Sequence, residues 1–381
     1  MPVPTHEQII DALRPVEDPE LRRSIVDLGM VRDIRIGADG AIGVQIALTV
    51  AGCPLRNEIQ NRVGGAVTQV AGVTGFTLDF TVMTDQEREA LREKLQGSGG
   101  QPAAQGGHGH AEGKAVPFNE PGNKTRPLLI SSGKGGVGKS SVTVNLAVAL
   151  ASQGYSVGVV DADIYGYSVP RMLGTDRDPV VIDQMLIPPE SHGVRCISIG
   201  YFVPEGQAII WRGPMLHKAL EQFLADVFWD EPDFLLIDMP PGTGDIALSL
   251  SQYLPRGEVY VVTTPQPAAQ KVAALSAAMA AKLNLPVKGI IENMSWFTGD
   301  DGKRYEIFGS GGGQALADDL GVPLLGKLPL VQQLREGGDN GNPITVADPS
   351  SELAQSFQEM ARRIATELKP KKIFSSALKV N

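Results

Sequence analysis

Cysteine is scarce in this sequence of 381 residues, and its absence from most of the chain excludes several kinds of site. The two cysteines, Cys53 and Cys196, lie far apart, and no C-x-x-C pattern occurs anywhere. A disulfide framework and a complete zinc site within one chain are therefore excluded. Cys196 falls in the apolar, strand-like run Val194–Ile199, which predicts an inert buried thiol.

The chain also has no very long apolar runs, and it has fewer basic than acidic residues. No apolar stretch approaches the length that spans a bilayer, and Met1–Asp11 holds too few apolar residues for a signal peptide. We therefore expect a cytoplasmic protein without stable membrane association. The 34 Lys and Arg residues against 43 Asp and Glu residues give a formal charge of -9. Because a non-specific nucleic-acid binder needs a basic face, no nucleic-acid partner is expected.

What the chain does contain is a phosphate-binding loop with the pattern G-K-G-G-V-G-K-S. The loop follows the apolar run Pro127–Ile130 and precedes the helical pattern Val142–Ala151, which is the strand–loop–helix context of a P-loop. Its glycines let successive backbone N–H groups approach the phosphates of a nucleotide. The predicted nucleotide-binding residues of the loop are Gly133, Lys134, Gly135, Gly136, Val137, Gly138, Lys139, Ser140 and Ser141.

Two side chains of the loop have roles that the P-loop pattern predicts, and a third is unusual. Lys139 is expected to neutralise the β- and γ-phosphates, and the Ser140 hydroxyl is expected to ligate Mg²⁺. The positive end of the following helix dipole adds to the field at the phosphates. Lys134, directly after the first glycine, goes beyond the general pattern.

Acidic residues follow two of the predicted strands. Asp161 and Asp163 come after Ser156–Val160, and Asp238 comes after Phe234–Ile237. Ligands of open α/β sheets bind at the carboxyl ends of strands, so we expect both groups to face the P-loop. Asp238 is predicted to be the Walker-B-type carboxylate at Mg²⁺, with Asp161 supporting the metal and Asp163 positioning or activating the attacking water. Taken alone, either group could instead cap a helix or form a turn.

The chain divides by composition into four parts: residues 1–95, 96–123, 124–368 and 369–381. The first predicts a small α+β domain, with a hairpin at Asp39-Gly40. The second is rich in Gly, Ala, Pro and Gln and predicts a flexible linker, in which His108 and His110 are either solvated or able to capture a metal. The third alternates apolar strands with helical patterns, which predicts a P-loop NTPase fold of the α/β class with a mainly parallel sheet flanked by helices.

The fourth part is a short basic tail. It follows a helical pattern in which Leu353, Phe357, Met360, Ile364 and Leu368 recur at helical spacing. We expect this helix to pack on the sheet, although a basic and partly apolar tail could also touch a membrane.

The first domain resembles the small domain of iron–sulfur assembly factors of the SufT/PaaD type. The resemblance rests on Asp18–Glu20, Asp27–Val31 and Thr49–Pro54, and it implies that Cys53 is a cluster-related residue. Cys53 precedes Pro54 at or next to a predicted helix N-terminus, where the dipole favours a thiolate. It is either such a metal-binding or reactive thiolate or a small residue that fills a turn, and position alone leaves both open.

The region from about Lys124 to Glu367 resembles the Mrp/ApbC iron–sulfur carrier ATPases, which belong to the MinD/ParA-like group with a deviant Walker A motif. The motifs in order are Gly133–Ser140, Asp161–Gly166, Trp211–Met215, Asp238–Asp245, Thr263–Gln266 and Glu292–Ser295. The resemblance implies a homodimer in which Lys134 reaches the partner's nucleotide, adenine recognition by Asn293, and apoprotein clients and assembly machinery as partners. A second cation at the γ-phosphate would stabilise transition-state charge as an arginine finger does.

One feature of that family is missing. Members commonly carry a C-x-x-C after the segment matching Glu292–Ser295, and the cysteines of two chains hold a bridging [4Fe–4S] cluster. Here Trp296–Gly309 contains no cysteine, and clusters are usually held by thiolates. Asp300 and Asp301 are hard oxygen ligands that suit a cluster poorly, and we predict that they form a β-turn.

Three functions remain open at this point. The first, which we expect, is an ATP-hydrolysing protein that binds an iron–sulfur cluster and transfers it to apoproteins. The cluster would be of the [4Fe–4S] type, with Cys53 as the cysteine ligand. The second is an ATPase that regulates assembly without carrying a cluster. The third is a MinD/ParA-like positioning ATPase.

Overall fold

The computed structural model describes residues 3–50, 53, 55–96, 115–120, 122–175, 177–203, 213–242 and 244–368. Several predictions lie outside these residues: most of the linker with His108 and His110, the tail 369–381, and Trp211, Arg212 and Thr243 of the family motifs. The chain divides into two compact units. One comprises Met1–Glu112, Pro179–Ile187 and Asp226–Phe228, and the other comprises Gly113–Asp178, Pro188–Ala225 and Trp229–Asn381.

The smaller unit is an α+β structure built on a three-stranded sheet in the order β1-β2-β3. Strands β1 and β2 are antiparallel, as the hairpin at Asp39-Gly40 predicts, whereas β2 and β3 are parallel and connected through α2. The side chains of Ile59 and Val63 on α2 are buried in the core. The elements are α1 (His6–Leu13), β1 (Val31–Ile36), β2 (Ala41–Leu48), α2 (Arg56–Thr68), β3 (Gly75–Val82), α3 (Asp85–Gln96), β6 (Val180–Ile182) and β7 (Met185–Ile187).

The larger unit is organised around an eight-stranded sheet in the order β15-β12-β11-β4-β10-β5-β9-β8. Every pairing in it is parallel except that of β8 with β9. The predicted α/β fold with a mainly parallel sheet is therefore confirmed. The strands are β4 (Arg126–Ser132), β5 (Val157–Asp161), β8 (Glu190–Ser191), β9 (Val194–Ser198), β10 (Phe234–Asp238), β11 (Glu258–Thr263), β12 (Val287–Glu292) and β15 (Leu324–Lys327).

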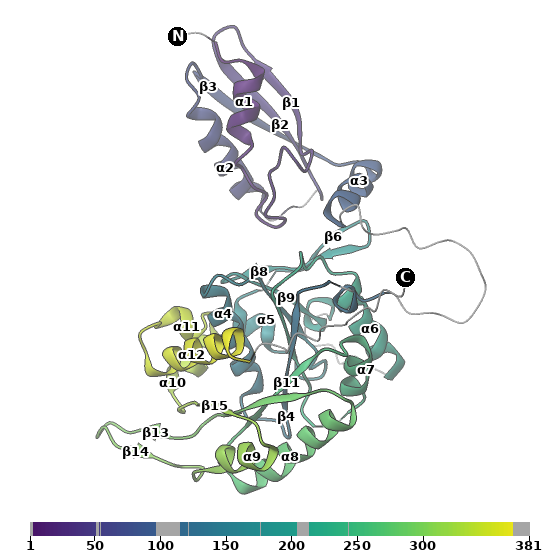
Figure 1. Cartoon of the computed structure of the whole chain (residues 1–381). Coiled ribbons are helices and arrows are strands. Elements are labelled where there is room, and N and C mark those ends of the chain that lie inside the picture. Colours follow the sequence, from purple (N-terminus) through teal and green to yellow (C-terminus); the bar gives the residue numbers. More distant parts are fainter. Residues whose placement is uncertain are drawn as a thin grey trace, which may run out of the picture. The chain divides into compact units, whose positions relative to one another are not determined.

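Helices cover both faces of this sheet, which explains why its central strands are almost entirely apolar. Helices α4, α5, α10, α11 and α12 pack together on one face, and α6 to α9 lie on the other (Figure 1). The larger unit contains the helices and 3₁₀ turns η1 (Pro117–Asn119), α4 (Lys139–Ser152), α5 (Val169–Leu173), η2 (Ile199–Phe202), α6 (Gly213–Ala225), α7 (Asp245–Tyr253), α8 (Pro267–Lys282), α9 (Gly312–Leu320), α10 (Gln332–Asp339), α11 (Ile344–Ala347) and α12 (Glu352–Thr366).

The predicted terminal helix is α12, and it packs against α4. Phe357, Met360 and Ile364 are fully buried in the same core as the P-loop helix. The Arg126 guanidinium donates to the carbonyl oxygens of Ile364 at 2.7 Å and Leu368 at 3.0 Å, so it caps the end of the helix.

The segment that lacks the family's cysteines is a small hairpin. Strands β13 (Phe297–Thr298) and β14 (Arg304–Tyr305) pair with each other, and the Gly302 N–H donates to the Gly299 carbonyl at 2.9 Å. Asp301 accepts from the Lys303 N–H at 3.0 Å and from the Tyr305 hydroxyl at 2.8 Å. The predicted turn at Asp300 and Asp301 is confirmed.

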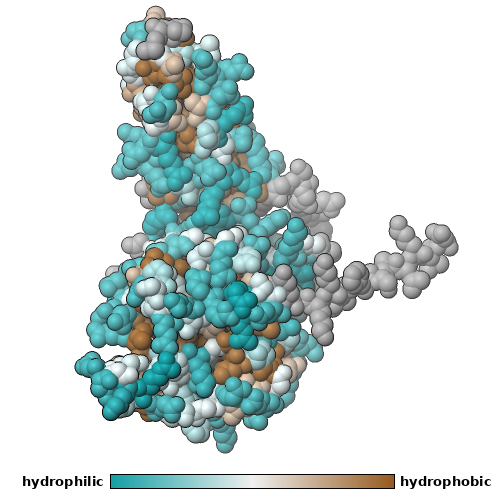
Figure 2. Space-filling model, turned by 60° about the vertical axis from the view of Figure 1, so that its left-hand side comes forward, coloured by the Kyte–Doolittle hydropathy of each residue, from teal (hydrophilic) through white to brown (hydrophobic). Residues whose placement is uncertain are grey.

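Hydrophilic residues cover most of the face shown in Figure 2, with smaller apolar patches between them. Among the described residues, no helix is both long and apolar enough to cross a membrane.

Candidate functional site

The P-loop connects the end of β4 to the first turn of α4, at the carboxyl edge of the sheet. Gly138 is the N-cap of α4, with a φ of 81°, and a Cβ there would lie 2.2 Å from Asn293 Nδ2. The positive φ and the close approach of the Asn293 side chain both favour glycine at this position. The loop borders a cavity of about 240 Å³, which is also lined by Asp163, Ser168, Met172 and Pro241.

Lys139 and Ser140 line this cavity, and both bond to the Asp238 carboxylate. Lys139 Nζ donates to Asp238 Oδ2 at 2.7 Å, and Ser140 Oγ donates to the same oxygen at 2.6 Å. Asp238 is fully buried at the end of β10, which lies between β4 and β5. Hydroxyl and carboxylate oxygens are the hard ligands that Mg²⁺ prefers, so this donor set fits the metal.

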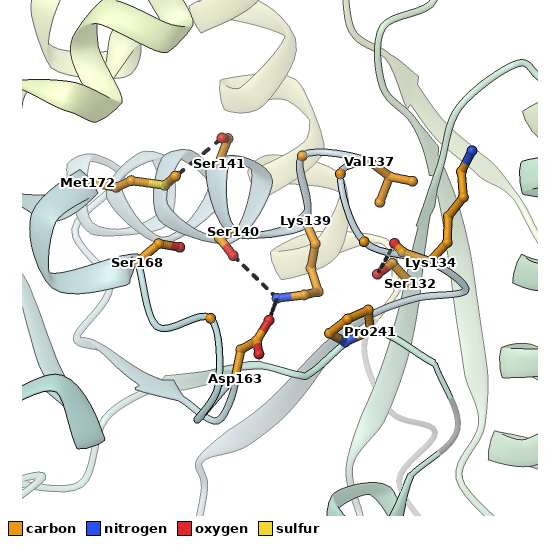
Figure 3. A pocket seen from close by; sticks show the side chains of 14 residues that line it. Ser132, Lys134, Val137, Lys139, Ser140, Ser141, Asp163, Ser168, Met172 and Pro241 are labelled. Atoms are coloured by element: carbon orange, nitrogen blue, oxygen red, sulfur yellow. Dashed lines mark hydrogen bonds and ion pairs between the residues drawn. The ribbon is translucent and has the colours of Figure 1, made fainter. Parts of the chain in front are cut away.

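The other two predicted carboxylates lie on the adjacent strand and loop. Asp163 Oδ2 is 3.7 Å from Lys139 Nζ, and the two side chains point toward each other across the cavity (Figure 3). Asp161 pairs in register with Asp238. Burial, followed by the charge of Asp238, raises the pKa of Asp161 to about 7, while burial raises the pKa of Asp163 against the opposing effect of Lys139.

Both oxygens of Asp161 are engaged by its own chain. Asp161 Oδ2 accepts from the Ser198 hydroxyl at 3.1 Å and from the backbone N–H groups of Ser168 at 3.1 Å and Val169 at 3.3 Å. Asp161 Oδ1 accepts from the Asp163 N–H at 3.2 Å. Asp161 therefore fixes the loop that carries Asp163, whereas its support of the metal stays a prediction.

Lys134 lies apart from this cluster. Its ammonium group points away from Lys139 (Figure 3) and donates to Gln266 Oε1 at 3.1 Å. Gln266 is the N-cap of α8, so both ends of this contact belong to motifs that the sequence singled out. The structure thus places Lys134 on the loop but not among the groups that meet Asp238.

Asn293 directly follows β12 and contacts the P-loop. Its Nδ2 donates to the Val137 carbonyl at 2.9 Å, and the side chain is 2% exposed. Its Oδ1 has no hydrogen-bond partner among the described residues. Next to it lies a cavity of about 190 Å³, lined by the apolar side chains of Met172, Met294, Leu330, Val331 and Leu334 together with Gly138, Ser141 and Arg335.

The two cysteines have different surroundings. Cys196 is fully buried on β9, and burial raises the pKa of its thiol, as the prediction of an inert thiol requires. Cys53 is partly exposed and packs against the core of the smaller unit. It lies three residues before the first residue of α2, and its carbonyl accepts from the Arg56 N–H at 3.3 Å.

Two hydroxyls at the site were missed by the sequence reasoning: Thr143 and Ser198. Both are fully buried, and each donates to one of the strand-end carboxylates. For Thr143 a signal existed, because it is a polar residue in the apolar run of α4, four residues after Lys139. A buried hydroxyl in such a place needs a partner.

Two family models match the chain. Residues 123–365, more than half of the chain, match the family described as "NUBPL iron-transfer P-loop NTPase". Residues 6–77 match the family described as "Iron-sulfur cluster assembly protein".

The chain is also similar to individual proteins over most of its length. An "Iron-sulfur cluster carrier protein" of Mycobacterium tuberculosis is 45% identical over 361 residues, covering 93% of this chain and 92% of that protein. A protein of the same description from Bacillus subtilis is 38% identical and covers 93% of this chain and 95% of its own length. Among solved structures, a nucleotide-binding protein from Archaeoglobus fulgidus in complex with ADP matches with a TM-score of 0.53 and 32% identity, over 61% of this chain and 93% of its own.

Proposed function

Because this chain belongs to the family of iron–sulfur cluster carrier P-loop NTPases, we propose that it hydrolyses ATP and transfers iron–sulfur clusters to apoproteins. The observation that carries the ATPase proposal is that Lys139 and Ser140, which line the cavity at the P-loop, both bond the buried Asp238 carboxylate. The similarity to a protein described in complex with ADP supports it.

The geometry supports a division of roles in phosphoryl transfer. Lys139 would leave Asp238 to bind the β- and γ-phosphates, while Ser140 and Asp238 would hold Mg²⁺, which neutralises phosphate charge when bound. Asp163 lines the same cavity. Its raised pKa makes the carboxylate a more effective proton acceptor. Asp163 would therefore orient the attacking water and accept its proton.

Asn293 is proposed to select adenine. Its buried Oδ1 is an acceptor without a donor among the described residues, and the exocyclic amine of adenine is a donor. A base in the adjoining cavity would also contact the apolar side chains of Met294 and Leu334. Guanine presents an oxygen at the same ring position, which would leave two acceptors facing each other.

We further propose that the nucleotide site is completed in a homodimer. Lys134 donates to Gln266 of its own chain rather than to the acidic cluster, so its charge is available for a second nucleotide. Reaching a partner's γ-phosphate would require this contact to break. ATP binding and dimer closure would thereby be coupled.

For the cargo, Cys53 is the proposed cysteine ligand, because Cys196 is fully buried within β9. Two copies of Cys53 per dimer would need further ligands from outside to complete a [4Fe–4S] set. The alternative is an ATPase that regulates assembly without carrying a cluster. The absence of a C-x-x-C after Asn293 favours that alternative.

Anaerobic reconstitution with iron and sulfide separates the two functions. Wild type should take up iron and sulfide in a constant ratio, and so should Cys196→Ala, the matched control. Cys53→Ala should not take up iron and sulfide in this way. In parallel, Lys139→Ala should lose ATP binding. A wild type that hydrolyses ATP but takes up no stoichiometric iron would establish the regulatory function instead.

A further inference from the structure

Helix α4 carries one buried hydroxyl that the P-loop pattern does not include. Thr143 is 0% exposed and lies four residues after Lys139, so the two residues share a face of the helix. Its Oγ1 is 2.6 Å from Asp238 Oδ1 and 3.0 Å from the Lys139 carbonyl oxygen.

Only one of these two oxygens can receive the Thr143 proton in a direct bond. A threonine hydroxyl carries one proton, and an ionised carboxylate can only accept. The shorter separation is the one to Asp238, and a value of 2.6 Å is typical of a hydroxyl bound to a carboxylate. Thr143 therefore donates to Asp238.

The two oxygens of Asp238 consequently face different groups. Oδ2 faces Ser140 Oγ and Lys139 Nζ on the phosphate side, and Oδ1 faces Thr143 from within the helix. We propose that Thr143 is a positioning residue that holds the Asp238 carboxylate by Oδ1, so that Oδ2 is presented to Mg²⁺ beside Ser140. This role rests on the proposed nucleotide chemistry, and nothing in the P-loop pattern assigns it.

The need for such a contact follows from what happens when nucleotide binds. Lys139 is then required at the phosphates and can no longer orient Asp238. Thr143 is fully buried and is not among the residues that line the P-loop cavity, so its bond to Asp238 does not depend on the nucleotide. Because Asp238 is fully buried, loss of this donor would leave Oδ1 with an uncompensated desolvation cost.

The test measures metal binding rather than turnover. The affinity of the ADP-loaded protein for Mn²⁺, used as a spectroscopic probe for Mg²⁺, is determined by electron paramagnetic resonance in wild type and variants. Thr143→Val keeps the side-chain shape but removes the hydroxyl, and Thr143→Ser keeps the hydroxyl. Thr125→Val is the matched control, because Thr125 is also buried but its Oγ1 has no hydrogen-bond partner among the described residues.

Thr143→Val should weaken Mn²⁺ binding about tenfold, the size expected for loss of one hydrogen bond to a charged group, while ADP affinity in the presence of EDTA is unchanged. Thr143→Ser should stay close to wild type, and so should Thr125→Val. Wild-type Mn²⁺ affinity in Thr143→Val, or equal losses in the valine and serine variants, would overturn the proposed role. A wild type that binds Mn²⁺ and ADP but does not hydrolyse ATP would contradict the proposed function and leave this result intact.

Discussion

At the residue scale, the nucleotide site is defined by polar atoms buried at the ends of β5 and β10. Asp161 and Asp238 are both fully buried and lie side by side in register. Their charges are compensated in different ways. Asp161 is held by its own loop and by Ser198, whereas Asp238 is held by Lys139, Ser140 and Thr143. In the proposed function, the second set would exchange partners when nucleotide binds.

The Asn293 Oδ1 atom, which has no hydrogen-bond partner in the part of the chain that the structure describes, gives a prediction about the base. Wild type should bind ATP at least about tenfold more tightly than inosine triphosphate, because the 6-oxo group of the latter would leave two buried acceptors facing each other. Competition binding with a fluorescent ATP analogue measures this ratio. Asn293→Leu should bring the ratio toward one. Equal affinities of wild type for the two nucleotides would contradict adenine selection by Asn293.

The sequence could predict the charged members of this site because each sits in a recognisable context: a P-loop, or the end of an apolar strand. It could not place Ser198, since a serine at the end of a strand is common and its partner lies 37 residues earlier in the chain. Nor could it show that Lys134 contacts Gln266, because that contact joins two separate motifs.

At the scale of elements, the P-loop depends on its fit against α8. A Cβ on Gly133 would lie 2.4 Å from the backbone N of Ala273 and 2.6 Å from the Val272 carbonyl oxygen. Neither atom belongs to a flexible side chain. The loop or α8 would have to shift to admit it.

Gly133→Ala should therefore lower the free energy of unfolding by about 1–3 kcal/mol, as overpacking does. Gly135→Ala is the control, because a Cβ on Gly135 would meet no atom within 4 Å. Urea unfolding followed by circular dichroism measures both. Equal stability of the two variants would show that the loop tolerates the shift.

Most elements of the larger unit were predictable because buried parallel strands appear as continuous apolar runs. In the smaller unit, helix α3 was missed: its sequence is mostly charged, and among its described side chains only Leu91 and Leu95 are buried in the core. The hairpin of β6 and β7 was also missed, because strands of three residues are too short to show a pattern.

At the scale of the whole molecule, two units share the chain. The small unit includes Pro179–Ile187 and Asp226–Phe228 as well as the N-terminal region. Composition cannot show that separate segments of the chain belong to the same unit, because it indicates only where one segment of the sequence ends and the next begins. The boundaries at residues 95 and 124 therefore stay a prediction.

The proposed homodimer predicts that Lys134→Ala retains ATP binding but loses turnover and ATP-dependent dimerisation. The reason is that the lysine would act at the partner's nucleotide rather than at its own. Sedimentation velocity with a non-hydrolysable ATP analogue measures dimerisation, and Lys282→Ala, at an exposed position in the last turn of α8, is the control. Unchanged turnover in Lys134→Ala would exclude the role across the dimer.

The central claim is that this protein delivers iron–sulfur clusters, and cluster transfer tests it most directly. Reconstituted wild type is mixed anaerobically with an apo-enzyme that needs a [4Fe–4S] cluster, and the recovered activity of that enzyme is followed over time in the presence of a chelator for free iron. Wild type should restore activity, while Cys53→Ala treated in the same way should not. Recovery no faster than with free iron and sulfide would contradict the claim.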